Sequence, residues 1–141
     1  YVFISHDLNV VRYVSDRVMV MYLGQIAEIG PVEQIYDNPL HPYTRALLRA
    51  MPSLNPRQRT EVAPLSGDPP NPIDPAPGCR FRDRCHFAEP VCEAQAPLPV
   101  LASGGACDAH LVACHMSDPR SGHSRACAAD GPAAGRDGAQ R

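Results

Sequence analysis

The stretch VMVMYLGQIAEI, residues 18–29, predicts a β-hairpin and is the segment from which the fold can be built. Val18 to Tyr22 is a continuous apolar run, and Ile26 to Ile29 is a second one. Leu23-Gly24-Gln25 supplies the turn between them. We therefore expect two antiparallel strands joined at this turn.

Helices are expected on both sides of the hairpin. Upstream, Asp7 is a good N-cap for a helix that carries apolar residues on one face and ends at Ser15-Asp16. Downstream, Gly30-Pro31 opens a short helix over residues 32–36, and a second helix covers residues 43–50. The pattern is typical of an α/β fold.

The first four residues, Tyr1 to Ile4, form a short apolar run that predicts a buried strand. Such a strand needs neighbours on both sides and cover on both faces, and the residues that follow it are too few to supply them. We therefore expect this chain to be the C-terminal piece of a longer protein.

Composition divides the 141 residues into four regions. Residues 1–52 carry the α/β pattern, residues 53–77 are a Pro-rich linker, and residues 78–116 hold most of the cysteines. Residues 117–141 show no apolar pattern and are expected to be disordered.

The 13 basic and 15 acidic residues give a net charge of −2, which offers no case for a nucleic-acid surface. No window approaches the length of a membrane-spanning helix.

His6 is the first candidate functional residue. It follows the predicted strand and precedes a predicted helix, which is where open α/β sheets bind ligands. Its imidazole can donate a hydrogen bond to a phosphate oxygen or orient water. On these few residues alone, a surface histidine between the helix-capping Ser5 and Asp7 is the better explanation.

Four cysteines form the second candidate site, as metal ligands: Cys79, Cys85, Cys92 and Cys114. Four thiolates in so short a segment repel one another and suit a soft metal or a cluster. Zinc is an alternative, although the spacings are wider than those of common zinc knuckles, and nearby His86, His110 and His115 favour it. Disulfides need an oxidising compartment, and reduced free thiols are the remaining interpretation.

The other cysteines and the neighbouring arginines have less definite roles. Cys107 is close enough to Cys114 to be a spare ligand, and Cys127 is expected to be a free thiol in the tail. Three arginines alternate with other residues in this segment: Arg80, Arg82 and Arg84. The alternation predicts either that they balance the charge of an anionic cluster or that they lie on a solvated strand face.

Three motifs together resemble a known family. Residues 5–8 with 15–26 and 28–30 resemble the last part of an ABC transporter ATPase domain. The stretch NPLHPYTRALL, residues 38–48, resembles the NP-x-HPYT-x-x-L segment of oligopeptide and dipeptide importer ATPases, and we expect it to have a structural role. Residues 78–115 resemble the cysteine-containing extension of the same importers. The implied fold is the C-terminal fragment of a P-loop NTPase domain followed by an irregular extension.

The resemblance implies specific roles for the candidate residues. His6 would be the switch histidine that contacts the γ-phosphate of ATP, which binds with Mg²⁺. Cys79, Cys85, Cys92 and Cys114 would hold a [4Fe-4S] cluster, with zinc as the alternative. The subunit would pair with a second ATPase subunit at the cytoplasmic face of the membrane. The pair would act on two transmembrane permeases served by a peptide-binding protein.

The sequence lacks a G-x-x-x-x-G-K-[ST] loop and contains no Lys, so the chain alone is expected neither to bind ATP tightly nor to hydrolyse it. The alternative function is a stand-alone iron–sulfur or zinc-binding interaction module without ATPase activity. An upstream coding stretch with a phosphate-binding loop would exclude this alternative.

Overall fold

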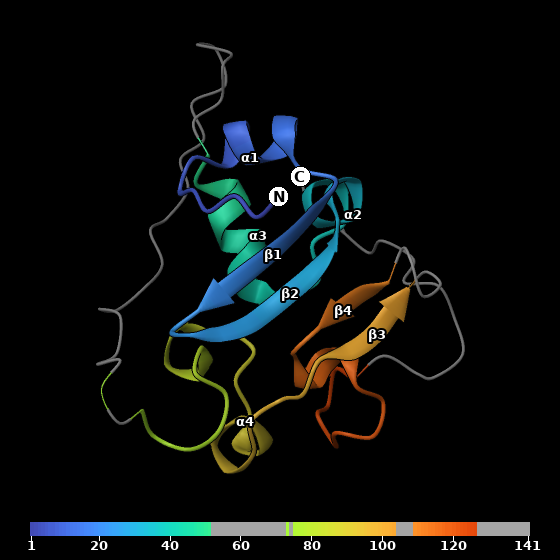
Figure 1. The fold of residues 1–141 in the computed structure, drawn as a ribbon. Helices are drawn as coiled ribbons and strands as arrows, with labels where there is room; N and C mark the ends of the chain where they lie inside the picture. The colour runs from blue at the N-terminus through green and yellow to red at the C-terminus, as the bar shows by residue number, and fades with distance from the viewer. Residues whose placement is uncertain (52–72, 74, 104–108, 127–141) are drawn as a thin grey trace, which may run out of the picture.

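The computed structural model describes residues 1–51, 73, 75–103 and 109–126. Its helices and strands, in chain order, are α1 (Leu8–Val14), β1 (Arg17–Tyr22), β2 (Gln25–Pro31), α2 (Val32–Asp37), α3 (Pro42–Arg49), the 3₁₀ turn η1 (Arg82–Arg84), α4 (Pro90–Ala94), β3 (Val100–Ser103), β4 (His110–Val112) and the 3₁₀ turn η2 (His115–Ser117). The strands form one four-stranded antiparallel sheet in the order β1-β2-β4-β3 (Figure 1). The expectation of a mixed α/β fold is confirmed.

The hairpin confirms the prediction made from residues 18–29. β1 and β2 pair from Arg17 opposite Pro31 to Tyr22 opposite Gln25. The turn residues Leu23 and Gly24 have φ angles of 47° and 75°, and the type I′ turn that suits a tight hairpin requires positive φ at both positions. Gly adopts this conformation at little cost, whereas Leu does so under strain.

The three helices of the first region also lie where the sequence placed them. The Asp7 carboxylate caps α1 by accepting hydrogen bonds from the backbone N–H groups of Asn9 and Val10 at 3.0 and 3.3 Å. α2 buries Ile35, which is 1% exposed. The Tyr36 hydroxyl donates to the Leu8 carbonyl and thereby joins α1 to α2. None of these helices, nor any other in the described part of the chain, has the length and apolarity that crossing a bilayer requires.

The predicted strand at residues 1–4 is absent, and this expectation is wrong for the structure. All four side chains are exposed, from Phe3 at 57% upward. An apolar run becomes a strand only beside a hydrogen-bonding partner strand. The described strands pair only among themselves and leave residues 1–4 without such a partner.

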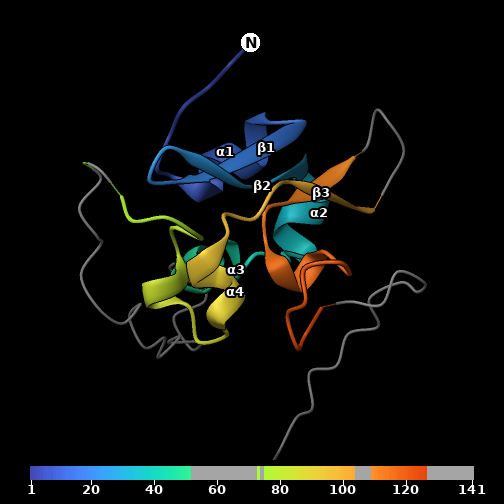
Figure 2. The ribbon, with the colours of Figure 1, turned by 90° about the horizontal axis from the view of Figure 1, so that it is seen from below.

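The cysteine-containing region is more regular than expected, because it contributes two strands to the sheet. β4 pairs with β2, with Glu28 opposite Val112 and Ile29 opposite Leu111. The Ala113 N–H also donates to the Ala27 carbonyl at 2.9 Å. Both views show the orange β4 segment beside β2 (Figures 1 and 2). The two regions that composition separates therefore share one sheet.

Two further predictions differ from the structure. Residues 117–126 are ordered and bury His123, so the expected disordered tail does not begin at residue 117. The arginine triplet lies in and around η1 rather than on a strand. Most of the Pro-rich linker, Cys107 and residues 127–141 lie outside the described residues.

Candidate functional site

One cavity brings together all four cysteines that the sequence singled out. Cys79, Cys85, Cys92 and Cys114 line it, together with the buried histidines His41, His115 and His123. Cys79 precedes η1, Cys85 caps it, Cys92 lies on α4, and Cys114 follows β4. The pairing of β4 with β2 is what carries Cys114 to the other three.

Local backbone geometry holds Cys79 close to Cys92. Gly78 has a φ of +93°, and a Cβ there would collide with the carbonyl oxygens of Cys92 and Glu93. This close approach lets the Cys79 N–H donate to the Cys92 carbonyl at 2.7 Å. Only glycine can adopt this positive φ and also leave room for the two carbonyl groups. The resulting backbone hydrogen bond joins the cysteine loop to α4 at Cys79 and Cys92.

Burial determines the charge state of the thiols. It raises the pKa of Cys79 and Cys85, and it raises the pKa of Cys114 to about 12. In each case a backbone N–H two residues further along, at Phe81, Phe87 or Met116, hydrogen-bonds the sulfur and partly opposes this rise. Burial therefore favours the neutral thiol at these three cysteines, and the backbone donors oppose it only in part.

The nearby histidines are already engaged with other groups. His115 Nε2 lies 2.9 Å from the Gln95 carbonyl, and His110 Nε2 lies 2.7 Å from Glu28 Oε1. His86 is exposed. Within residues 1–51, 73, 75–103 and 109–126, no three Cys, His, Asp or Glu side chains are arranged so that they could hold a metal ion. The four thiols thus share a cavity without forming a coordination sphere.

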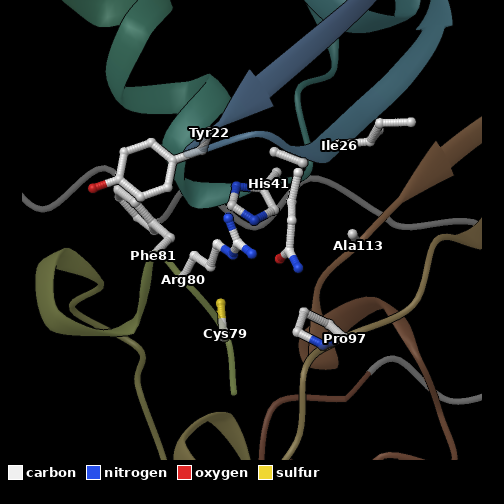
Figure 3. Close-up of a pocket in the computed structure, with 10 residues that line it drawn as sticks. Tyr22, Ile26, His41, Cys79, Arg80, Phe81, Pro97 and Ala113 are labelled. Atoms are coloured by element: carbon white, nitrogen blue, oxygen red, sulfur yellow. The ribbon is translucent and has the colours of Figure 1, made fainter. Parts of the chain in front are cut away.

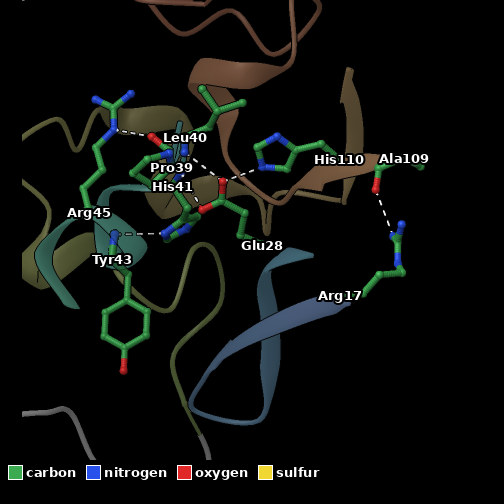
Figure 4. Close-up of polar contacts among 9 residues, drawn as sticks. All are labelled: Arg17, Glu28, Pro39, Leu40, His41, Tyr43, Arg45, Ala109 and His110. Atoms are coloured by element: carbon green, nitrogen blue, oxygen red, sulfur yellow. Dashed lines mark hydrogen bonds and ion pairs between the residues drawn. The ribbon is translucent and has the colours of Figure 1, made fainter. Parts of the chain in front are cut away.

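A buried hydrogen-bonded pair, Glu28 and His110, was missed by the sequence analysis. Glu28 and His110 are both 0% exposed, and each Glu28 carboxylate oxygen also accepts a backbone N–H, from Leu40 at 2.8 Å and from His41 at 3.1 Å (Figure 4). Burial alone would raise the pKa of Glu28, but these hydrogen bonds outweigh it and lower the pKa. The ionised carboxylate therefore joins β2, β4 and the loop before α3. We call this group the Glu28 clasp.

His41 of the HPYT segment has the structural role that the sequence predicted. Its Nδ1 accepts the Tyr43 N–H at 3.0 Å and so caps α3. Burial lowers the pKa of His41 to about 4, against the opposing effect of the Glu28 carboxylate. The ring is therefore neutral at pH 7, with its proton on Nε2.

An aromatic cluster connects the HPYT segment to the cysteine loop. The ring centroid of Phe81 lies 5.3 Å from that of Tyr22 and 5.4 Å from that of Tyr43. Phe81 is 3% exposed and is thus as well buried as the hairpin residues it contacts. Such contacts add to the free energy gained from burial.

A second cavity, which Phe81 also lines, shows the role of two of the arginines. Residues lining this cavity include Tyr22, Ile26, His41, Cys79, Arg80, Phe81, Pro97 and Ala113 (Figure 3). Arg80 donates to the Leu23 carbonyl of the hairpin turn, and Arg82 donates to the Pro77 carbonyl. Both side chains therefore brace the cysteine loop, and neither forms part of a solvated strand face.

His6 stands apart from the cysteine site. It is exposed just before α1 and lines neither of the two cavities described above. The structure thus gathers the cysteine part of the predicted site and leaves His6 on the surface.

Comparison with known proteins gives consistent matches. Residues 27–92 match the family model described as the C-terminal region of oligopeptide/dipeptide transporters. The chain is 48% identical over 118 residues to a di/tripeptide transport ATP-binding protein, DppF, of Pseudomonas aeruginosa, covering 84% of this chain and 35% of that protein. It is 54% identical to the dipeptide transport ATP-binding protein DppF of Haemophilus influenzae, with the same coverage of 84% and 35%. It is 48% identical to the oligopeptide transport ATP-binding protein AppF of Bacillus subtilis, covering 82% and 35%. The chain therefore spans about a third of the length of these relatives.

Proposed function

Residues 27–92 belong to the family of oligopeptide/dipeptide transporter C-terminal regions, and from this premise we propose that the chain is the C-terminal part of the ATP-binding subunit of an ABC importer for oligopeptides or dipeptides. The observation that carries the proposal is the identity of 48–54% to ATP-binding proteins of three peptide transporters. All three are named as ATP-binding proteins, so they lend no support to a stand-alone metal-binding module.

In this proposal the intact subunit binds ATP and Mg²⁺ mainly through residues that this chain does not contain. It pairs with a second ATPase subunit at the cytoplasmic face of the membrane. Together the two act on two permease subunits that receive peptide from a binding protein. The energy of ATP hydrolysis drives the transport step, and the described region supports the subunit's architecture.

Within the described region, His6 is the residue we assign to ATP. It lies immediately before α1, whose first turn is fixed by the Asp7 cap. The Asp7 N–H also donates to the Ser5 hydroxyl oxygen at 3.0 Å, so the backbone on both sides of His6 is held. An imidazole in this position can donate a hydrogen bond to a γ-phosphate oxygen.

Substitution of His6 tests this assignment. In the intact subunit, His6→Ala should lower kcat for ATP hydrolysis by roughly 10²–10³-fold and leave the Kd for ATP nearly unchanged, because the lost contact acts mainly in the transition state. The matched control is His86→Ala, since His86 is also an exposed histidine. Equal losses of kcat and of ATP affinity, or an unchanged kcat, would contradict the role.

For the second site, we propose that Cys79, Cys85, Cys92 and Cys114 hold a [4Fe-4S] cluster, with zinc as the alternative. The support is chemical: four thiols share one cavity, and backbone N–H groups already point at three of the sulfurs. Hydrogen bonds to ligand sulfurs and low solvent exposure are what such clusters use. A bound cluster would supply the positive charge that keeps the thiols ionised, and it would staple a segment with a small core.

Metal content distinguishes these cofactors. The intact protein purified without oxygen should be brown and contain iron and acid-labile sulfide, and Cys114→Ser should lose both. The matched control is Cys127→Ser, a cysteine outside the proposed ligand set, which should retain both. A colourless preparation that contains zinc would establish the alternative, and one with neither metal would contradict both.

A further inference from the structure

The segment after Cys114 lines the cysteine cavity, although it lies outside residues 27–92, which match the family model. His115, Met116 and His123 all line that cavity. We call residues 115–126 the latch. Its near end is fixed by the hydrogen bond between His115 Nε2 and the Gln95 carbonyl, 2.9 Å away.

His123 holds the far end of the latch. Its Nε2 lies 2.9 Å from the Phe87 carbonyl, and its Nδ1 accepts the Arg125 N–H at 3.0 Å. The accepting role of Nδ1 places the proton on Nε2, which therefore donates to Phe87. His123 is only 5% exposed, so both hydrogen bonds are shielded from water.

Ser124 and Arg125 add further contacts to the same segment. The Ser124 N–H donates to one Glu89 carboxylate oxygen at 2.9 Å, and the Ser124 hydroxyl donates to the other. The Arg125 guanidinium lies over the Phe87 ring, 4.7 Å from its centroid. Phe87 and Glu89 lie between Cys85 and Cys92 in the sequence, so the latch is attached to the segment that joins these two cysteines.

The latch is also closed upon itself. The Ser121 hydroxyl donates to the His115 carbonyl at 2.6 Å and accepts the His123 N–H at 3.2 Å. Gly122, at a φ of +77°, turns the chain between them and has nothing within 4 Å of its Cβ position. These internal hydrogen bonds would keep the segment together as a unit when its outer contacts break.

Of the four cysteines, only Cys92 is buried, and Cys79, Cys85 and Cys114 are half-buried. We propose that the latch opens locally and thereby controls the access of small reagents in solution, namely soft metal ions and their chelators, to Cys92 and the cavity around it. A few hydrogen bonds and one cation–π contact fix its far end, and Gly122, Ser124 and Arg125 are exposed. Segments held in this way open at a lower free energy than the sheet. The proposal depends on the cavity alone and applies to an iron–sulfur cluster or to zinc.

Alkylation of the thiols measures this opening. The intact protein, reduced and free of metal, is treated with iodoacetamide, and modification of the buried Cys92 is followed by peptide mass spectrometry. His123→Ala removes the donor to Phe87 and should accelerate alkylation roughly 5–30-fold, as expected when local opening becomes easier. His123→Gln keeps an N–H near the same carbonyl and should restore a rate close to that of the unmodified protein.

The matched control is Arg120→Ala, in the same segment. The Arg120 side chain is 89% exposed and pairs with Asp118 of the latch, so this change should leave the alkylation rate unaltered. Equal rates in the unmodified protein and His123→Ala would overturn the proposal. So would a simultaneous loss of amide protection in β1 and β2, which would mean global rather than local opening. Because the assay uses neither ATP nor bound metal, its result is separable from those of the two functional proposals.

Discussion

His41 is a buried, uncharged histidine that fixes the start of α3. The motif made its structural role predictable, because a residue before Pro42 at a helix start commonly caps the helix. Its charge state was not predictable from the motif. The low pKa comes from burial, to which Phe81 contributes, and it persists against the opposing charge of Glu28. Both Phe81 and Glu28 are distant from His41 in the sequence.

This burial makes stability depend on pH. The folded pKa of His41 is about 4 against an ordinary value of 6.5, so between pH 6.5 and 4 the unfolded chain binds a proton that the folded chain does not. Stability should therefore decrease as the pH falls through this window. In His41→Asn the amide oxygen still caps α3 but does not titrate, so this pH dependence should shrink by on the order of 3 kcal/mol.

Urea unfolding at several pH values within that window measures the difference. The matched control is His86→Asn, since His86 is exposed and its replacement should leave the pH dependence as it was. If His41→Asn lost stability with falling pH as steeply as the unmodified protein does, the buried neutral ring would not be the cause.

Glu28 shows where prediction at the residue scale fails. Its position in an apolar strand was visible, but its partner His110 is 82 residues away. A charged residue among apolar neighbours is compatible with an exposed strand face or with a buried pair. Only the pairing of β2 with β4 decides between them, and local sequence does not encode that pairing.

At the scale of elements, the hairpin turn carries removable strain. Leu23 has a φ of 47°, and left-handed backbone costs a residue with a Cβ atom about 1–2 kcal/mol, whereas Asn adopts it more readily. Leu23→Asn should therefore raise the free energy of unfolding by about 1 kcal/mol, measured in urea. Leu23→Ala, which keeps the unfavourable backbone preference, is the matched control and should show no such gain. A destabilised Leu23→Asn protein would count against this account of the turn.

The cysteine loop offers a sharper comparison between two glycines of positive φ. Gly78→Ala adds both backbone strain and a collision with the Cys92 and Glu93 carbonyls, whereas Gly122→Ala adds strain alone. We expect Gly122→Ala to cost about 1 kcal/mol in urea unfolding and Gly78→Ala to cost clearly more. Gly78→Ala should also speed alkylation of Cys79, because the hydrogen bond from the Cys79 N–H to the Cys92 carbonyl would be lost. Equal costs at both positions would show that the close approach at Gly78 is unimportant.

The predicted elements succeeded or failed for identifiable reasons. The hairpin and the first three helices followed from local apolar patterns and caps, and the structure confirms them. Residues 1–4 failed because a strand depends on neighbours that a pattern does not reveal. The structure of the latch was not predicted, because hydrogen bonds through His123 and Ser124 hold it in place and its sequence has no apolar pattern.

At the scale of the whole molecule, Phe81 is the side chain that joins the two regions. It packs against Tyr22 and Tyr43 of the first region and lines the cysteine cavity of the second. Phe81→Ala should cost about 3–5 kcal/mol and reduce amide hydrogen-exchange protection in β1 and β2 as well as around α4. Phe3→Ala, at a phenylalanine that is 57% exposed, should change stability by less than about 0.5 kcal/mol. Loss of protection confined to one region would mean that the two fold independently.

Composition sets the cysteine-containing region apart and suggests an appendage. The sequence pattern grouped the four cysteines as one candidate site, and all four line one cavity of the structure. It could not show that β4 completes the sheet begun by β2, because that pairing spans most of the chain. Long-range strand pairing is the part of a fold that local patterns constrain least.

The same pairing has a consequence for how the protein is made. As the polypeptide leaves the ribosome, β2 is synthesised long before β4, so one edge of the young hairpin has no hydrogen-bonding partner throughout that interval. An open edge is a template for joining another nascent chain. That edge of β2 can be covered only after residues 110–112, which form β4, have been synthesised.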